Sequence, residues 1–155
     1  MKQFMKVLIW IVILGAVLFG VYTILPEYPQ SFMKSFVQPV VDAQAKTRIE
    51  QVKALKNKDV DASYQEILEH YTNTSCWVYE QGAGNEIVTF YGKGASINIK
   101  DVPNHEDHLY PSTAVKFEFV ITGNNVEIKA YIEDNLQDET IRDLMISQLY
   151  AGGKK

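Results

Sequence analysis

The chain of 155 residues contains a single cysteine, Cys76. One cysteine cannot form an internal disulfide, so a disulfide framework is excluded and packing must hold the folded part together. The apolar and aromatic neighbours of Cys76 indicate a small core residue rather than a nucleophile. The sequence also lacks internal repeats and the motifs of phosphate loops, dinucleotide sites, serine-hydrolase elbows and zinc proteases. We therefore expect a protein that is not an enzyme and that carries no cofactor.

The sequence also has fewer basic than acidic residues. The sequence has 15 Lys and Arg against 19 Asp and Glu, and only Lys2 and Lys6 fall within its first 24 residues. The remainder is therefore acidic, with a formal charge of about −6. A nucleic-acid-binding domain normally presents a basic face. We expect no nucleic acid among the partners of this protein.

Residues 7–24 (VLIWIVILGAVLFGVYTI) form one unbroken apolar run without a charge. At about 1.5 Å per residue a helix of this length spans roughly 27 Å, close to the thickness of the hydrocarbon core of a bilayer. Lys2 and Lys6 precede the run, and this asymmetry places the N-terminus in the cytoplasm. The sequence thus predicts a single-pass protein of the cell membrane, held through residues 7–24, with an extracytoplasmic C-terminal domain.

A cleaved signal peptide is the alternative for the same segment, because a charged start before an apolar run fits both. The run is longer than the roughly 7–15 apolar residues of a typical signal peptide, and no small-x-small cleavage site precedes Pro26. We favour a retained anchor. The expected division is 1–25 for the cytoplasmic start and anchor, 26–38 for a juxtamembrane segment, and 39–155 for the exported domain.

Three stretches after the anchor have helical patterns. Residues 31–37 are amphipathic, which is consistent with a segment along the membrane surface and equally with a packed lead-in turn. Pro39 suits the first turn of a helix that continues to Lys56. Ser63 and Glu66 form a capping pattern before a second, short helix. A last helix follows a cap at Asn135 or Asp138 and ends at the glycine pair 152–153.

Between residues 74 and 133 the apolar period changes to two, which is typical of strands. We expect strands over 74–81, 86–92 and 95–101, and a hairpin formed by residues 113–122 and 125–134. With Gly123-Asn124 as its turn, Phe119 lies opposite Ile128 on an apolar face. A turn at Asn124-Asn125 remains as an alternative register.

The element order predicts an α+β domain in which two helices and a C-terminal helix pack on a curved, mostly antiparallel sheet of about five strands. At this level it resembles the nuclear-transport-factor-2-like (NTF2-like) cone fold. Single-pass proteins with an exported domain of that kind include inner-membrane assembly components of type IV secretion systems. The resemblance implies a membrane-anchored assembly factor; it rests on element order and the anchor.

Two groups of residues are candidates for chemistry or ligand binding. His105 and His108 lie three residues apart in an acidic loop and are weak candidates for a metal site, although a solvated loop explains them better. The cone fold often has a pocket between sheet and helices. The residues that we expect to line such a pocket are Tyr64, His70, Tyr71, Trp77 and Tyr79.

The sequence favours a protein-binding scaffold or assembly factor of a cell-envelope complex, with other envelope proteins as partners. Val120 and Tyr131 are expected on the polar face of the sheet and are its interface candidates. The alternative is a binder of a small-molecule or lipid-derived ligand, or a weak enzyme, with a pocket under the curved sheet. A sealed core favours the scaffold, and a deep pocket with a buried carboxylate or His70 favours the alternative.

Overall fold

The computed structural model describes Val12 and residues 27–152. The apolar run at residues 7–24, on which the predicted anchor depends, lies outside this part of the chain except for Val12. None of the helices in the described residues combines the length and the apolar character that crossing a bilayer requires.

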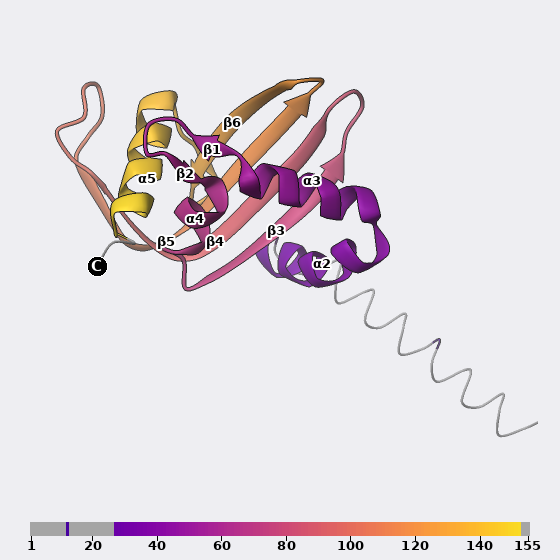
Figure 1. Ribbon diagram of the computed structural model, residues 1–155. Helices are drawn as coiled ribbons and strands as arrows, with labels where there is room; N and C mark the ends of the chain where they lie inside the picture. Colours follow the sequence, from indigo (N-terminus) through magenta and orange to yellow (C-terminus); the bar gives the residue numbers. More distant parts are fainter. Residues whose placement is uncertain (1–11, 13–26, 153–155) are drawn as a thin grey trace, which may run out of the picture.

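Within residues 27–152, four helices pack on a five-stranded antiparallel sheet, so the predicted α+β class is confirmed (Figure 1). The helices are α2 (Glu27–Val41), α3 (Ala43–Ala54), α4 (Tyr64–Glu69) and α5 (Glu139–Gly152). The sheet has the order β3 (Thr74–Gln81), β4 (Glu86–Ile99), β5 (His108–Thr122), β6 (Asn125–Ile132) and β7 (Asn135–Leu136). Two short segments, β1 (Lys56–Asn57) and β2 (Ala62–Ser63), pair with each other before α4.

The hairpin of β5 and β6 has the register predicted from its sequence. Phe119 pairs with Ile128, and on the opposite face Glu118 pairs with Lys129. Gly123 adopts φ +59° at the first central position of the turn, where glycine is favoured in two-residue hairpin turns. The register with its turn at Asn124-Asn125 is therefore not the one adopted.

Strand β4 corrects one expectation. The sequence predicted two strands, over 86–92 and 95–101, but β4 is continuous from Glu86 to Ile99. Its pairing with β5 shifts between Lys93 and Ala95, and Gly94 between them has φ +81°. A bulge of this kind bends a strand without ending it, so the glycine that suggested a break marks a bend instead.

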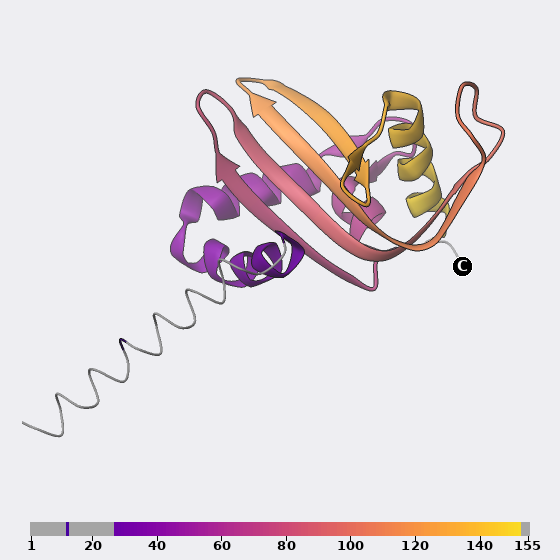
Figure 2. The same ribbon diagram turned by 180° about the vertical axis from the view of Figure 1, so that it is seen from behind.

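The core lies between the concave face of the sheet and helices α3, α4 and α5 (Figures 1 and 2). Apolar burial on both sides of this interface is the main stabilising contribution to such a fold. The largest of its fully buried side chains are Phe90, Phe117, Phe119, Ile67, Leu68 and Ile97.

Helix α2 corrects a second expectation. The sequence predicted a helix that begins at Pro39, but α2 begins at Glu27 and contains Pro39 close to its end. The chain breaks instead at Asp42, which caps α3 by accepting a hydrogen bond from the backbone N–H of Ala45 (3.0 Å). Asp is one of the strongest N-cap residues. The expected division between residues 38 and 39 falls inside this helix.

Helix α2 packs on edge strand β3. The Gln38 amide donates to the Tyr79 carbonyl (2.6 Å) and accepts from the Tyr79 N–H (2.8 Å), which satisfies the backbone groups of Tyr79 on the open edge of β3. Lys34 forms an ion pair with Glu80 at 2.9 Å. Residues facing away from the main core on β3, such as Cys76, are buried by this helix.

The ends of the shorter helices agree with the sequence. Ser63 accepts from the backbone N–H of Glu66, and the Glu66 carboxylate accepts from the backbone N–H of Ser63, which completes the predicted capping box of α4. Asp138, one of the two candidate caps, accepts from the backbone N–H of Ile141 (3.0 Å) at the start of α5.

Candidate functional site

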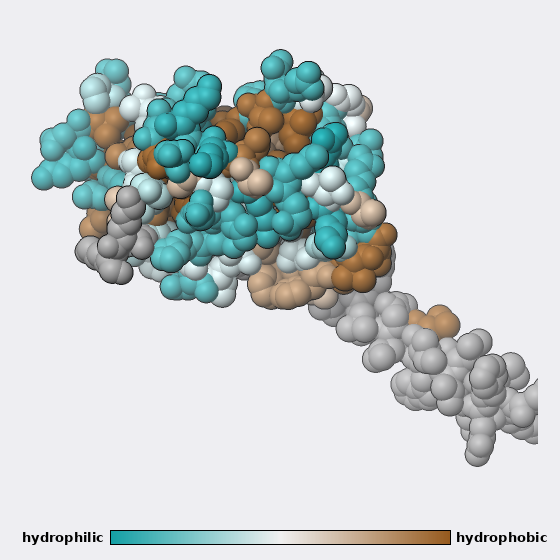
Figure 3. All heavy atoms as spheres, viewed as in Figure 1, coloured by the Kyte–Doolittle hydropathy of each residue, from teal (hydrophilic) through white to brown (hydrophobic). Residues whose placement is uncertain are grey.

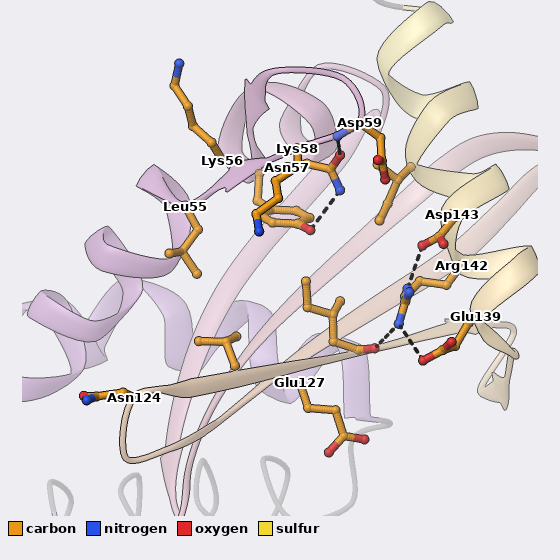
Figure 4. Close-up of a pocket in the computed structure, with 14 residues that line it drawn as sticks. Leu55, Lys56, Asn57, Lys58, Asp59, Asn124, Glu127, Glu139, Arg142 and Asp143 are labelled. Atoms are coloured by element: carbon orange, nitrogen blue, oxygen red, sulfur yellow. Dashed lines mark hydrogen bonds and ion pairs between the residues drawn. The ribbon is translucent and has the colours of Figure 1, made fainter.

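One hollow on the described part of the chain is an open groove of about 850 Å³ (Figure 4). Three stretches far apart in the sequence form it: residues 55–59 between α3 and β2, residues 124–128 at the start of β6, and the first turns of α5. A second hollow of about 490 Å³ shares Leu55, Asn124 and Val126 with the first and continues along α3. Together they form one trough, which we call the β6 trough.

The floor of the β6 trough is apolar and its rim is charged. Leu55, Tyr64, Val126, Ile128 and Ile146 supply apolar surface at its base. The charged side chains of its rim are Arg48, Lys56, Lys58, Asp59, Glu127, Glu139, Arg142 and Asp143. An apolar centre inside a mixed polar rim is the usual anatomy of a protein-binding surface.

Strand β6 contributes an open edge to the trough. Its only partner on the side away from β5 is β7, which pairs with Tyr131 and Ile132, so Asn125–Lys129 has no strand partner there in the described residues. Backbone groups alternate in direction along an antiparallel strand. The Ala130 carbonyl accepts from the N–H of Gln137 on the outer side, so Ile128 and Val126 also direct their backbone groups outward.

Arg142 is held at one wall of the trough by its neighbours on α5. Its guanidinium donates to Asp143 (2.9 Å) and to the Ile128 carbonyl (3.3 Å), and lies 3.8 Å from Glu139 (Figure 4). The hydrogen bond from Arg142 to Asp143 is the main cause that raises the pKa of Arg142. The guanidinium is therefore a fixed structural cation, and nearby carboxylates already balance its charge.

The buried side-chain polar groups at the trough are satisfied within the protein. The Asn57 amide donates to the Tyr64 hydroxyl (3.1 Å) and accepts from the N–H of Asp59 (2.9 Å). Burial raises the pKa of the Tyr64 phenol, so the hydroxyl stays protonated. Among the described residues every buried side-chain polar atom has a hydrogen-bond partner. The arrangement suits binding by shape and by backbone hydrogen bonds.

The five residues expected to line one pocket are dispersed, with Tyr64 at the trough and Trp77 at a separate hollow of about 230 Å³ between α2 and α3. Only Tyr64 lines the trough, and its ring packs edge-on against Phe119 with centroids 4.9 Å apart. Trp77 is buried and donates to Glu69 (2.8 Å), and the Tyr79 hydroxyl donates to Glu86 (2.8 Å).

The remaining two expected pocket residues lie near the C-terminal end of α4. His70 is exposed there, and Tyr71 lies half-buried beside it against Gly152. These two rings are 6.3 Å apart. His70 is therefore not in the core. A buried His70 is the feature that would have favoured a ligand site under the sheet.

The two histidines of the acidic loop contact different residues. His105 lies 2.8 Å from Asp138 at the start of α5, while the ring of His108 packs on Tyr110 at 4.2 Å. A backbone hydrogen bond from Ile141 is the main cause that lowers the pKa of Asp138, and His105 adds to it. In the described residues no three His, Cys, Asp or Glu side chains gather as metal ligands.

The two interface candidates lie on the convex face of the sheet, where both are half-buried rather than fully exposed. The Tyr131 hydroxyl donates to Glu118 (2.7 Å), and the Lys116 ammonium lies 4.2 Å from the centroid of its ring. Val120 is on the adjacent strand, opposite Glu127. The Tyr131 side chain is therefore held against the sheet by Glu118 and Lys116.

Cys76 is 5 % exposed between β3 and α2. Burial is the main cause that raises the pKa of its thiol to about 11, and a hydrogen bond with Ser35 opposes it. The thiolate is the reactive form. We expect Cys76 in the folded chain to resist a maleimide at pH 8 and to react promptly after denaturation, as followed by mass spectrometry. Equal rates in both states would contradict its position under α2.

The sequence did not reveal the β6 trough. Its signals were present but scattered: Val126 belongs to the apolar row of the hairpin, and residues 57–59 looked only like a helix break. Nothing in a local pattern brings these segments together with Arg142. The trough forms because the segment between α3 and α4 lies beside the start of β6.

Comparisons of the chain with protein-family models, with curated proteins and with solved structures give no match.

Proposed function

We propose that this chain is a membrane-anchored, non-enzymatic scaffold whose extracytoplasmic domain binds an extended segment of another cell-envelope protein in the β6 trough. The single observation that carries the proposal is the coincidence of an apolar floor with the open edge of β6 along the same hollow. An extended peptide can add to such an edge through backbone hydrogen bonds while its alternate side chains enter the groove.

The shape of the trough supports an extended occupant. The two hollows that form it share residues of the β5–β6 turn and continue toward α3 on one side and α5 on the other. The core beneath is filled by apolar and aromatic side chains, so the binding surface is shallow. Mixed charges on the rim suit discrimination between partners more than capture of one ionic ligand.

The location in the cell and the finer fold are part of the same proposal. Residues 7–24 are long and apolar enough for an anchor, and Lys2 and Lys6 favour a cytoplasmic N-terminus. We also propose that the domain is an NTF2-like cone. The curved antiparallel sheet with helices on its concave side supports this assignment. A role in assembling an envelope complex follows from the analogy between such anchored cone domains.

The second candidate function is the binding of a small-molecule or lipid-derived ligand. It is favoured by the volume of the first hollow, about 850 Å³, which lies within the range of roughly 300–1,000 Å³ common for ligand pockets. The wide opening of the trough and the absence of an unpaired polar anchor among the described residues count against it.

A photoreactive residue at Asn124 tests the proposal in intact membranes. Asn124 is exposed and lines both hollows, so we expect it to give a protein adduct of defined mass. The same residue at Leu136, which is 61 % exposed on β7 and lines neither hollow, is the matched control. An adduct with a lipid or small molecule would favour the second function, and equal adducts at both positions would contradict a specific trough.

Proline at Val126 separates edge pairing from simple proximity. The Val126 N–H points outward, so Val126→Pro removes a donor from the open edge and leaves the hydrogen bonds to β5 in place. We expect the Asn124 adduct to be lost in this variant and kept in Val126→Ala, which retains the N–H. Loss in both variants would show that side-chain contact, and not strand addition, holds the partner.

A further inference from the structure

Helix α2 presents an apolar face that no other described part of the chain covers. Figure 3 shows brown, hydrophobic atoms gathered over this helix. We call it the α2 face, and its members are Phe32, Met33, Phe36, Val37, Val40 and Val41. Their exposed fractions run from 36 % at Phe32 to 84 % at Val40. This exposure is unusual for large apolar side chains and indicates an interaction surface.

The spacing of these residues places them on one side of the helix, because positions 32, 36 and 40 and positions 33, 37 and 41 each recur at intervals of four. The opposite side is occupied by the domain through Ser31, Lys34, Ser35 and Gln38. The α2 face is therefore fixed in direction, and rotation of the helix cannot bury it.

The charge of α2 also points to one kind of occupant. Between residues 28 and 41 the sequence has no Asp or Glu, and its one cation, Lys34, is paired with Glu80. The α2 face itself, from Phe32 to Val41, is free of charge over a length of about 15 Å at roughly 1.5 Å per residue. An interface between proteins usually adds a polar rim to its apolar centre, whereas a helix lying in a bilayer presents an apolar face to the acyl chains.

We propose that the α2 face lies in the boundary between the headgroups and acyl chains of a lipid bilayer, with the helix parallel to the membrane plane. Only residues 25 and 26 separate the apolar run at 7–24 from Glu27, where α2 begins. Three peptide steps span at most about 11 Å. If the run crosses the bilayer, as the proposed function assumes, α2 begins close to the membrane surface.

The orientation of the domain follows from this contact. Helix α2 packs on β3, at one edge of the sheet, and the β6 trough lies toward the other edge. In Figures 1 and 2 helix α2 and strand β6 lie on opposite sides of the domain. A lipid contact at α2 thus sets β3 toward the membrane and directs the β6 trough away from it, open to an exported partner.

The test uses the full chain reconstituted in vesicles of phosphatidylethanolamine and phosphatidylglycerol, in a Cys76→Ala background. A single cysteine at Val40 is labelled with an environment-sensitive fluorophore, and Leu136→Cys, an exposed apolar position at the far edge of the sheet, is the matched control. We expect spin-labelled lipid to remove most of the fluorescence at position 40 and little of it at position 136.

Each other outcome overturns the inference in a distinguishable way. If the chain floats with the vesicles but the two labels are quenched equally weakly, α2 does not contact lipid and the anchor stands. If unlabelled Val40→Cys chains form disulfides with each other and the label at that position is not quenched, a second copy covers the α2 face. If the chain does not float with the vesicles, both the lipid contact and the proposed anchor fail.

Discussion

Aspartate at Phe119 is expected to unfold the domain. Phe119 is fully buried on the concave face of β5, where its ring contacts Tyr64 and Trp77 with centroids 4.9 and 5.9 Å apart. The new carboxylate would have no partner there, and an unpaired buried charge costs several kcal/mol after its pKa adjusts. That cost, added to the lost ring packing, approaches the whole stability of a typical domain, about 5–15 kcal/mol.

The control for this prediction is Val120→Asp on the same strand. Val120 is half-buried on the convex face, so a carboxylate there reaches water and we expect a loss of about 1 kcal/mol. Near-UV circular dichroism of the purified full-length chain in detergent, followed through a thermal transition, compares the two. Equal losses would show that the assigned faces of β5 are wrong.

Alanine at Phe90 is expected to produce the second largest effect, a loss of about 3–5 kcal/mol in the free energy of unfolding. Phe90 is fully buried at the centre of β4, and its ring packs edge-on against Trp77 at 4.9 Å. Removing the ring loses its burial and leaves a cavity, because β3 and β5 fix the backbone on both sides. The chain should still fold, with a lower transition midpoint in urea.

The same chemical change at Phe36 isolates the effect of burial. Phe36 is 65 % exposed on α2, so Phe36→Ala should cost about 0.5 kcal/mol or less when the chain is unfolded by urea. A loss at Phe36 as large as that at Phe90 would mean that the α2 face is buried against protein. That result would argue against the proposed lipid contact as well.

Local patterns were sufficient to predict several elements closely. The apolar alternation of the two hairpin strands specified both faces, and glycine before asparagine at the turn favoured the register that pairs Phe119 with Ile128. The Ser63–Glu66 spacing predicted the start of α4. These features depend on neighbours along the chain or across a two-residue turn, so their information lies within a short stretch of sequence.

Two boundaries were wrong where a local signal was overruled by packing. Pro39 suggested the start of a helix, yet α2 continues through it. Proline cannot donate a backbone hydrogen bond. Contacts of α2 with β3, such as the two hydrogen bonds between the Gln38 side chain and the Tyr79 backbone, offset this loss. Gly94 suggested the end of a strand, yet β4 continues because β5 pairs with it on both sides of the bulge.

The candidate site could hardly be predicted at all. Of the residues expected to line a pocket, only Tyr64 reaches the β6 trough, and Arg142 and Val126 carried no local signal of their role. By itself the sequence determined the α+β class, the two faces of the hairpin and the apolar character of residues 31–41, and the structure decided between the two hairpin registers. Only the tertiary structure decided that β6 keeps an open edge beside an apolar hollow and that α2 turns its apolar face outward. Both depend on contacts between segments far apart in the chain, which neither period nor spacing specifies.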